Sequence, residues 1–497
     1  MTIDVDLVVA GAGGGLCGAL RAAQLGLDVL VVEASEHFRR GNNTSMSTAM
    51  IPGAGSAFQR AAGIEDSPAR FLADISAKTH GSAEPVAARA LATVSAELVE
   101  WLADHVGVPI ELPTDFGYPG HSVPRMHSVP SRHGSELLRH LMSAVSASDR
   151  IDVLVPARLV AAVPEDTAVP EDTAVPEDTA VPEDGGVPED GGVTAVIERP
   201  DGSRESVRGS ALLLATSGYA ADRAAVREHL PEIASAEYHG SEYAQADALR
   251  IGAACGADVG YLDAYQGHAG LSEQARTLVT WATIMHGGIL VNARGRRFGD
   301  ETVGYSQYAA ALATQPGAAG WIVLDQRIHA LSLAFTDYRQ VAECGAVRTA
   351  DSADELAEVI SADPAALRDE LDEAAEVASG ARAADRFGRT IFPEALRAPY
   401  RAVQVMPALF HSQGGLLVNE HAQVRNRDGG TVPGLYAAGG AAAGISGHGA
   451  AGYLAGNGLL PALGLAYLAA SHLAASHPAA SHPARQPAQR AARQVNP

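Results

Sequence analysis

Cysteine is scarce in this chain, with three residues among 497. Cys17, Cys255 and Cys344 lie far apart and have neither the paired spacing of a metal site nor that of a redox motif. We therefore expect no metal site, and we expect three reduced thiols that serve as packing residues in a cytoplasmic protein.

Charged residues are also few, at 19% of the chain, and positive charge is the scarcer sign. Acidic residues outnumber basic ones by 58 to 36, which gives a formal net charge of −22. Because nucleic-acid binding needs a concentrated basic face, this balance argues against a nucleic-acid partner. No apolar run approaches the roughly eighteen residues that span a bilayer, and the first residues lack the features of a signal peptide. We expect a cytoplasmic protein without a transmembrane segment.

The first thirty-three residues carry the pattern that organises the chain. An apolar strand over 6–10 leads into a glycine-rich turn over 11–15, a helix of small residues and a second strand that ends at Glu33. Glycines let the backbone approach a pyrophosphate, a helix start offers free N–H groups, and a terminal acid accepts hydrogen bonds from ribose hydroxyls. The pattern predicts a dinucleotide site, although the third glycine of G-x-G-x-x-G falls on Leu16. The alternative is a turn with a purely structural role.

Two polar loops follow in the first third of the chain. The loop 39–53 comes directly after Glu33, and its small side chains suit contact with a flat ring; the alternative is an ordinary surface loop. Between residues 114 and 134, glycines and prolines exclude regular structure, yet donors and titratable groups are dense. Such loops often carry function, although each of these side chains could equally face water.

Three segments of biased composition are expected to contribute little to a hydrophobic core. Residues 163–190 repeat Val-Pro-Glu-Asp five times, which predicts an expanded, solvated hairpin insert. Residues 351–380 are acidic and helical, and we expect a solvated helix pair there. The last apolar helix should end near Ala470, and the Ala-Ser-His-Pro tail over 471–497 should be disordered, with histidines that are solvated rather than metal ligands.

Taken in order, these motifs resemble those of the flavoproteins related to fumarate reductase and succinate dehydrogenase. The resemblance implies an α/β fold: a doubly wound, Rossmann-like FAD-binding domain over 1–267 and 396–470, and an inserted α+β cap, or catalytic, domain over 268–395. It also implies FAD bound non-covalently, because no histidine stands where members with covalent flavin attach it. The likeness rests on the N-terminal unit, the loop 41–50, and the segments 215–218, 287–292, 411–415 and 434–439.

The resemblance further implies which residues contact the cofactor. One departure is Gly440, because the family usually has an acid directly after the Ala-Ala-Gly turn. The expected FAD contacts are Gly11, Gly13, Gly14, Gly15, Glu33, Asn43, Thr44, Ser45, Thr216, Gly218, Asp247, His411, Gly414, Gly415, Gly439, Gly440 and Leu459.

Two arginines that the fumarate-type reductases use are tyrosines in this chain. The position of the arginine proton donor, shortly after the acid of the catalytic segment, holds Tyr305, and the position of the arginine that clamps a substrate carboxylate holds Tyr453. This pattern resembles the 3-ketosteroid Δ1-dehydrogenases, whose cap tyrosine abstracts a proton and whose C-terminal tyrosine holds the ketone oxygen. Tyr118 is placed like the third tyrosine of that site.

The resemblance therefore implies desaturation of a cyclic ketone, with Tyr305 as the base, Tyr118 assisting it and Tyr453 donating to the ketone oxygen. A hydride passes to flavin N5, and an external acceptor of unidentified kind, a quinone, O₂ or a carrier, takes the electrons. The short folded part favours a small ring such as 4-oxocyclohexanecarboxylate over a 3-oxosteroid. The residues expected to meet the substrate are His121, Arg125, Arg132, Gly456, Asn457 and Gly458.

Two other functions remain open at this point. One is the reduction of an unsaturated carboxylic acid, as in fumarate or urocanate reductases. The other is a degenerate flavin-binding or interaction protein, for which the altered glycine loop and Gly440 would be the indication.

Overall fold

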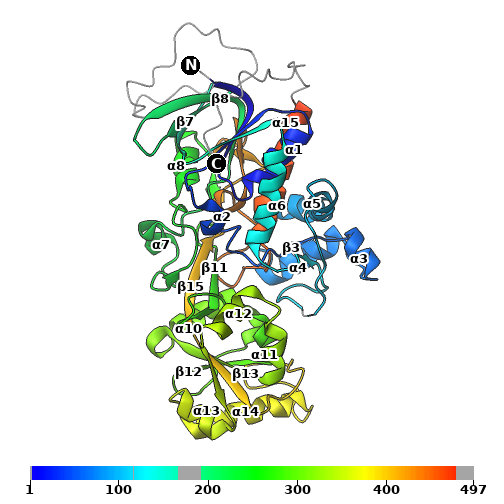
Figure 1. The fold of residues 1–497 in the computed structure, drawn as a ribbon, viewed down its shortest axis with the longest axis vertical. Helices are drawn as coiled ribbons and strands as arrows, with labels where there is room; N and C mark the ends of the chain where they lie inside the picture. The colour runs from blue at the N-terminus through cyan, green and yellow to red at the C-terminus, as the bar shows by residue number, and fades with distance from the viewer. Residues whose placement is uncertain (1–2, 116, 166–191, 477–497) are drawn as a thin grey trace.

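The computed structural model describes residues 3–115, 117–165 and 192–476. They form two units along the long axis of the molecule, connected by the long strand β15 (Tyr400–Ser412) and by β11 (Tyr265–Ser272) (Figure 1). We call the part built from the elements between β11 and β15 the cap unit, and the rest the N-terminal unit.

The N-terminal unit is built on an eight-stranded sheet with a parallel centre. Strand β1 (Ile3–Ala10) lies between β2 (Val29–Val32) and β8 (Arg204–Leu214) and runs parallel to both. Helix α1 (Gly15–Gln24) connects β1 to β2, so the predicted strand–turn–helix–strand unit and the α/β fold are confirmed. The remaining strands of this sheet are β5 (Ile151–Leu154), β6 (Arg158–Pro164), β7 (Val193–Glu198), β17 (Gln423–Arg425) and β18 (Thr431–Ala437).

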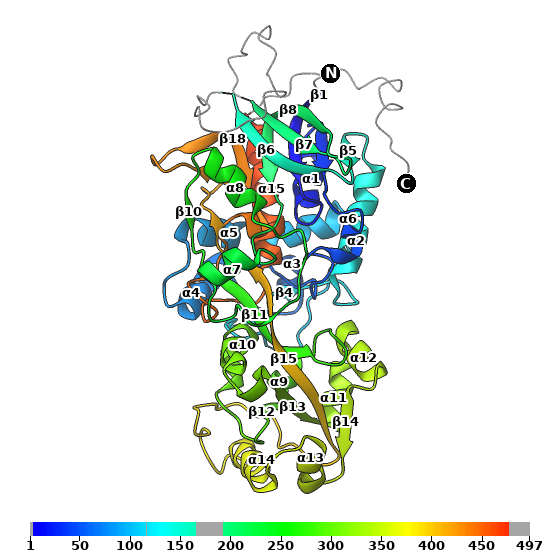
Figure 2. The same cartoon turned by 90° about the vertical axis from the view of Figure 1, so that its left-hand side faces the viewer.

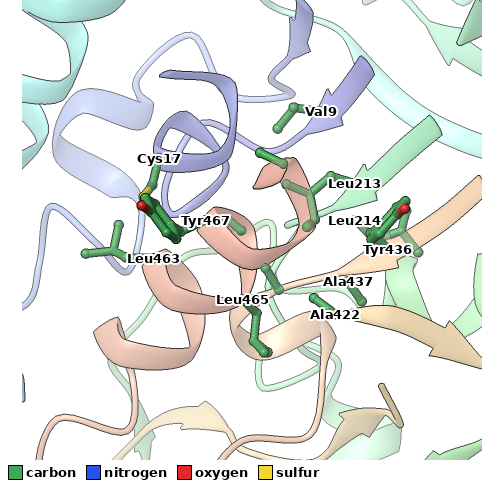
Figure 3. Close-up of a cluster of buried hydrophobic side chains, with 14 of the residues drawn as sticks. Val9, Cys17, Leu213, Leu214, Ala422, Tyr436, Ala437, Leu463, Leu465 and Tyr467 are labelled. Carbon is green, nitrogen blue, oxygen red and sulfur yellow. The ribbon is translucent and has the colours of Figure 1, made fainter. Parts of the chain in front are cut away.

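Helices α1 and α15 (Leu459–Ser476) pack against each other over this sheet. Figure 3 shows part of the buried cluster that joins them: Cys17 of α1 lies beside Tyr467 of α15. Apolar side chains from both chain ends therefore close the core beneath the turn that follows β1.

Helix α15 corrects the expected end of the last helix and bears on the expected absence of a transmembrane segment. It continues to Ser476 instead of ending near Ala470, and its eighteen residues have a mean hydropathy of 1.4, so by length and composition it could cross a membrane. In the structure 61% of it is buried, and it packs against α1 and α5 (Pro85–Asp104). A helix that is apolar on all sides is typical of the interior of a large protein as well as of a bilayer.

The cap unit is built on a second, six-stranded sheet in the order β11-β15-β13-β12, with β14 and β9 also paired to β15. The acidic residues 351–380 form two helices as expected, and the inner faces of both pack on this sheet through residues such as Leu356 and Leu367. Strand β9 (Glu237–Tyr238) precedes β11 in the chain and joins this sheet by pairing with β15. The elements between β11 and β15 are α9 (Ala282–Met285), β12 (Ile289–Asn292), η2 (Glu301–Val303), α10 (Tyr305–Ala313), η3 (Pro316–Ala318), β13 (Gly320–Asp325), α11 (Gln326–Ser332), α12 (Thr336–Glu343), β14 (Val347–Ala350), α13 (Ala353–Val359) and α14 (Pro364–Ala378).

Strand β11 crosses the expected domain boundary at 268, whereas β15 begins at Tyr400, after the expected boundary at 395. The division of the chain into these domains stays a prediction. Strands β6 and β7, which flank the Val-Pro-Glu-Asp repeat, pair antiparallel. Residues 166–191 and 477–497, which hold most of the predicted insert and tail, lie outside the described residues. The other elements are α2 (Phe38–Gly41), β3 (Ile51–Pro52), α3 (Ala57–Ala61), α4 (Pro68–Thr79), β4 (Met126–His127), α6 (Gly134–Ala147), α7 (Arg223–His229), α8 (Asp247–Ala254), β10 (Val259–Gly260), β16 (Gly415–Leu416) and η4 (Gly439–Ala441).

Candidate active site

One large cavity runs from the turn after β1 to the junction with the cap unit. Gly11 begins this turn with φ +108°, and a Cβ added there would lie 2.3 Å from the carbonyl oxygen of Ala215. At Gly14 an added Cβ would lie 2.5 Å from the oxygen of Ala462. Helix α1 starts directly after this turn without a side-chain cap, so the partial positive charge of its N-terminus lies at the turn. A glycine turn that opens a helix at the end of a parallel strand fits a pyrophosphate.

Glu33 lies at the end of β2 and lines the same cavity. One carboxylate oxygen accepts the N–H of Ala12 at 2.7 Å and the other accepts the N–H of Ser35 at 2.8 Å. Burial raises the pKa of the Glu33 carboxyl, and these backbone donors oppose the rise. Each oxygen keeps a further lone pair, so the carboxylate can also accept from ribose hydroxyls.

The loop after Glu33 packs against the end of β8. Asn43 donates to Ser217 Oγ at 3.1 Å and accepts the N–H of Ser241 at 2.8 Å, which fixes the loop along the cavity. The hydroxyl of Thr216 lines the cavity, and this buried oxygen has no hydrogen-bond partner among the described residues. An unpaired buried hydroxyl is costly unless a ligand satisfies it, so Thr216 fits a polar group of a bound FAD.

Of the seventeen predicted FAD contacts, twelve line the cavity: Gly11, Gly13, Gly14, Glu33, Asn43, Thr44, Thr216, Asp247, His411, Gly439, Gly440 and Leu459. Asp247 is also paired with Arg158 at 2.7 Å. Burial lowers the pKa of His411 to about 4, so its ring is neutral. Gly440 lies so close to the end of β8 that an added Cβ would be 2.8 Å from the Gly218 nitrogen. At this position, where the resemblance implies an acidic residue, the surrounding backbone leaves no room for a side chain.

The other five predicted contacts do not line the cavity and pack the surrounding elements. Ser45 donates through its hydroxyl to the oxygen of Asn42 at 2.8 Å, which braces the loop. A Cβ added at Gly218 would lie 2.1 Å from Ser412 Oγ, so this glycine allows close packing of backbone. Added Cβ atoms at Gly15, Gly414 and Gly415 would likewise meet neighbouring atoms within 2.6 Å.

The three predicted tyrosines meet at the junction of the two units. Tyr305 begins α10 in the cap unit, Tyr453 precedes α15, and Tyr118 comes from the loop between α5 and β4; all three line the cavity. The hydroxyls of Tyr305 and Tyr453 are 3.4 Å apart and their ring centroids are 5.5 Å apart. Residues separated by 148 positions in the chain therefore face each other across the cavity.

Burial is the largest influence on the pKa of these three phenols. It raises the pKa of Tyr305 well above the usual value near 10, and the neighbouring Tyr453 raises it further. Burial also raises the pKa of Tyr453 and of Tyr118, where the Arg132 guanidinium opposes the effect. The phenols are therefore hydrogen-bond donors at neutral pH, and an ionised form requires alkaline conditions or a bound group that stabilises it.

Sequence reasoning missed the aromatic wall behind these tyrosines. His268 of β11 stacks on Tyr305 with ring centroids 4.7 Å apart and on Phe410 at 5.6 Å, and Trp281 packs edge-on against His268. The N–H of Gly270 donates to His268 Nδ1 at 2.9 Å, which places the ring proton on Nε2. Burial lowers the pKa of His268 to about 3, so the ring is neutral. The alternation of a strand over 265–272 could have placed Gln266 and His268 on one face, and both line the cavity.

The predicted substrate contacts divide into two groups. Arg132, Gly456 and Gly458 line the cavity. The guanidinium of Arg132 forms a bidentate pair with Asp115 at 2.8 and 3.0 Å and lies 5.0 Å over the ring of Phe335. Arg132 is thus the predicted cation that reaches the tyrosines, and it already has an anionic partner.

His121, Arg125 and Asn457 are not among the residues that line the cavity, and their expected contact with a substrate stays a prediction. The fully buried Arg125 is paired with Asp66 at 2.9 Å and Asp74 at 2.5 Å. The His121 ring contacts the Ala455 oxygen at 2.9 Å, and burial lowers its pKa to about 4. Asn457 is buried and braces the segment before α15, accepting the N–H of Ile445 at 2.8 Å and donating to Ser446 Oγ at 2.6 Å. These polar groups therefore have partners within the fold.

The chain is similar to known proteins in sequence and in fold. The chain is 30% identical over 454 residues to an NADH:fumarate oxidoreductase of Klebsiella pneumoniae (strain 342), covering 89% of this chain and 45% of that relative. The fold is similar to the open conformation of a flavocytochrome c3 fumarate reductase, with a TM-score of 0.73, 24% identity, and coverage of 95% of this chain and 78% of that chain. It is also similar to the 3-ketosteroid Δ1-dehydrogenase of Sterolibacterium denitrificans, with a TM-score of 0.71, 18% identity, and coverage of 96% and 100%.

The chain spans less than half the length of the Klebsiella relative. In contrast, the match to one protein family extends over almost the whole of the described structure. Among the described residues, no group of three or more His, Cys, Asp or Glu side chains is placed to hold a metal ion. The pattern of the FAD binding domain family matches residues 6–459. This range includes the turn after β1, the cap unit and Tyr453. The chain therefore belongs to the FAD binding domain family, and it is a flavin-dependent oxidoreductase that uses FAD.

Proposed function

We propose that this flavoprotein introduces a carbon–carbon double bond beside the carbonyl group of a cyclic ketone. The observation that carries the proposal is the meeting of Tyr305 and Tyr453, 3.4 Å apart, at the positions where fumarate-type reductases carry arginines. Phenols can donate to and accept from a ketone, but they offer no charge to clamp a carboxylate.

The charges along the cavity support a neutral reacting group. Among the described residues that line it, the arginines are Arg132 and Arg158, and each is paired with a carboxylate. The histidines His239, His268 and His411 all have a lowered pKa because they are buried. A dicarboxylate would therefore enter without an uncompensated cation to receive it, which is costly in a site of low polarity.

In the proposed reaction, Tyr453 donates a hydrogen bond to the ketone oxygen and stabilises the negative charge that develops there. The phenolate of Tyr305 removes a proton from the carbon beside the carbonyl, and Tyr118 stabilises that phenolate. FAD held by residues such as Gly11, Glu33 and Thr216 would supply the acceptor for the hydride of the neighbouring carbon, and an external electron acceptor would be needed to reoxidise it. The wall of His268, Trp281 and Phe410 keeps water from the reacting carbon atoms and presents a flat apolar face to a ring.

The expected substrates are a small ring such as 4-oxocyclohexanecarboxylate or a 3-oxosteroid. Likeness in fold to a 3-ketosteroid Δ1-dehydrogenase supports the ring class. Arg132 lies on the cavity and is the group that a ring carboxylate would meet, if that carboxylate displaced Asp115. The two substrate types can therefore be distinguished by comparing a carboxylated ring with a neutral ring of the same size. Turnover of the carboxylated ring should depend on Arg132, and turnover of the neutral ring should not.

A second function, the reduction of an unsaturated carboxylic acid, is favoured by relatives named for fumarate reduction. An anaerobic titration followed by flavin absorbance separates the two. We expect a saturated cyclic ketone to bleach the oxidised flavin, with an α,β-unsaturated ketone as the product. Rapid reoxidation of the reduced flavin by fumarate or urocanate, without bleaching by any cyclic ketone, would support the reductase instead.

A further inference from the structure

Lys78 is the single lysine in the chain, and all other basic residues among the 36 are arginines. It lies in the last turn of α4 in the N-terminal unit, and its side chain is half-buried. Its ammonium donates a 2.7 Å hydrogen bond to the carbonyl oxygen of Val303, which ends η2 in the cap unit. Figure 2 shows α4 at the end of the N-terminal unit that faces the cap unit and α10.

The segment that Lys78 reaches leads directly into Tyr305. On the side of the cap, this segment is fixed by Glu301, whose buried carboxylate accepts from Arg297 at 2.6 Å and from Arg389 at 2.9 Å. Gly304 then adopts φ +118° and ψ 150°, a conformation open almost only to glycine, and it separates η2 from α10. Tyr305 therefore begins a new helix, and its direction depends on how the preceding three residues are held.

The N-terminal unit meets this backbone at two residues. A Cβ added at Gly304 would lie 3.7 Å from Pro119 Cβ and 3.8 Å from Lys78 Nζ. Pro119 directly follows Tyr118, so the contact lies where the loop of one phenol meets the segment of the other. Burial lowers the pKa of the Lys78 ammonium, and a buried charge is retained only where a partner such as the Val303 carbonyl compensates it.

We propose that Lys78 is a positioning residue that fastens the cap unit to the N-terminal unit at Val303 and thereby sets where the Tyr305 phenol lies. Lys78 does not line the cavity, so it acts through the Val303 carbonyl and not on the substrate. The consequence for catalysis rests on the function proposed above for Tyr305. The fastening itself does not, because it would hold the cap in place for any substrate.

The test compares three variants of the FAD-loaded full chain. Lys78→Met removes the donor, and Lys78→Arg keeps a cation that can still reach a carbonyl. Arg70→Met is the matched control, because Arg70 is on the same helix but donates to Ser122 and Glu65 of its own unit. FAD content is measured by absorbance, the flavin reduction rate by stopped flow at saturating ketone, and flavin accessibility by acrylamide quenching of its fluorescence.

We expect Lys78→Met to bind FAD normally, to be quenched more strongly by acrylamide and to reduce its flavin at least about tenfold more slowly. Lys78→Arg should recover much of the rate, and Arg70→Met should match the wild type in both measurements. Wild-type quenching and wild-type rate in Lys78→Met would overturn the proposal, as would equal losses in Arg70→Met.

The two proposals fail separately. If no cyclic ketone reduces the wild-type flavin, the proposed function is wrong, and the quenching comparison still decides the role of Lys78. A second measurement avoids any folding defect of the variant: acetylation of the folded holoenzyme can modify Lys78 as the only lysine side chain. Loss of rate in proportion to the acetylated fraction of Lys78, read by peptide mass spectrometry, supports the fastening, and full rate at complete acetylation overturns it.

Discussion

The substitution Tyr305→Phe tests the proposed chemistry most directly, because it removes one oxygen atom and leaves the ring. The ring stack on His268, with centroids 4.7 Å apart, does not involve the hydroxyl and should persist. The hydroxyl itself makes a long contact of 3.4 Å to Tyr453, so its loss should change the free energy of unfolding by no more than about 1.5 kcal/mol. Loss of a positioned general base lowers a rate by about 10² to 10⁴, or roughly 2.7 to 5.5 kcal/mol in the activation barrier.

The same helix supplies a matched control. Tyr308 lies three positions further along α10 and is more deeply buried than the half-buried Tyr305; its hydroxyl is also 3.4 Å from an acceptor, the Gly299 oxygen, but it does not line the cavity. Tyr308→Phe should match Tyr305→Phe in thermal stability and FAD content while keeping the wild-type rate of flavin reduction within about threefold, because it changes no group near the substrate. Equal rates for the two variants, or Tyr305→Phe within tenfold of the wild type, would refute the assignment of the base.

Three further outcomes follow from the geometry. Because burial raises the pKa of Tyr305 and only its phenolate can take a proton, kcat/KM should rise about tenfold per pH unit between pH 6 and 9; a flat profile would contradict a phenolate base. Glu33→Gln places an NH₂ group against the N–H of Ala12 or Ser35 and should weaken FAD binding at least about tenfold by fluorescence titration. Arg125→Met leaves the carboxylate of Asp66 buried without its cation and should lower the free energy of unfolding by about 3–5 kcal/mol in urea denaturation, without raising the KM of the folded enzyme.

The cofactor half of the site could be predicted because its signals are local. A short apolar strand, a glycine turn and a helix of small residues form one connected unit, and Glu33 follows in the next strand. Hydrogen bonds and packing between neighbours in sequence determine such a unit, so a pattern of thirty-three residues contains most of the information. The twelve predicted residues on the cavity wall mostly come from segments of this kind.

Polar residues in the loops on either side of β4 could not be assigned in this way. Arg125, His121 and Arg132 are all basic residues in similar polar loop segments, yet their hydrogen-bond partners differ. Arg125 is paired with Asp66, 59 residues away, and the His121 ring meets an oxygen 334 residues away. Whether such a side chain faces a cavity depends on which distant element packs against it. The neighbouring residues in the sequence contain no signal for that packing.

The length of α15 shows the same dependence on distant partners. Residues after Ala470 read as the start of a polar low-complexity tail, but the fold satisfies their polar groups. Arg21 of α1 donates to Ser471 Oγ at 3.0 Å, and the Tyr436 hydroxyl lies 2.9 Å from His472 Nδ1. Docking on α1 and β18 thus extends the helix past the point at which composition alone would end it.

Departures from a family pattern therefore have two distinct physical causes in this chain. At Gly440 the missing acid reflects space, because the end of β8 leaves no room for a Cβ. At Tyr305 and Tyr453, where the resemblance to fumarate-type reductases implies arginines, large side chains fill both positions and their hydroxyls meet in the cavity, which under the proposed function is a change of chemistry. A change that preserves size and replaces charge by a neutral donor alters which substrate the site can stabilise, whereas a change forced by packing does not. The tyrosine pair thus carries the argument for the proposed ketone substrate, whereas Gly440 bears only on how the surrounding backbone packs.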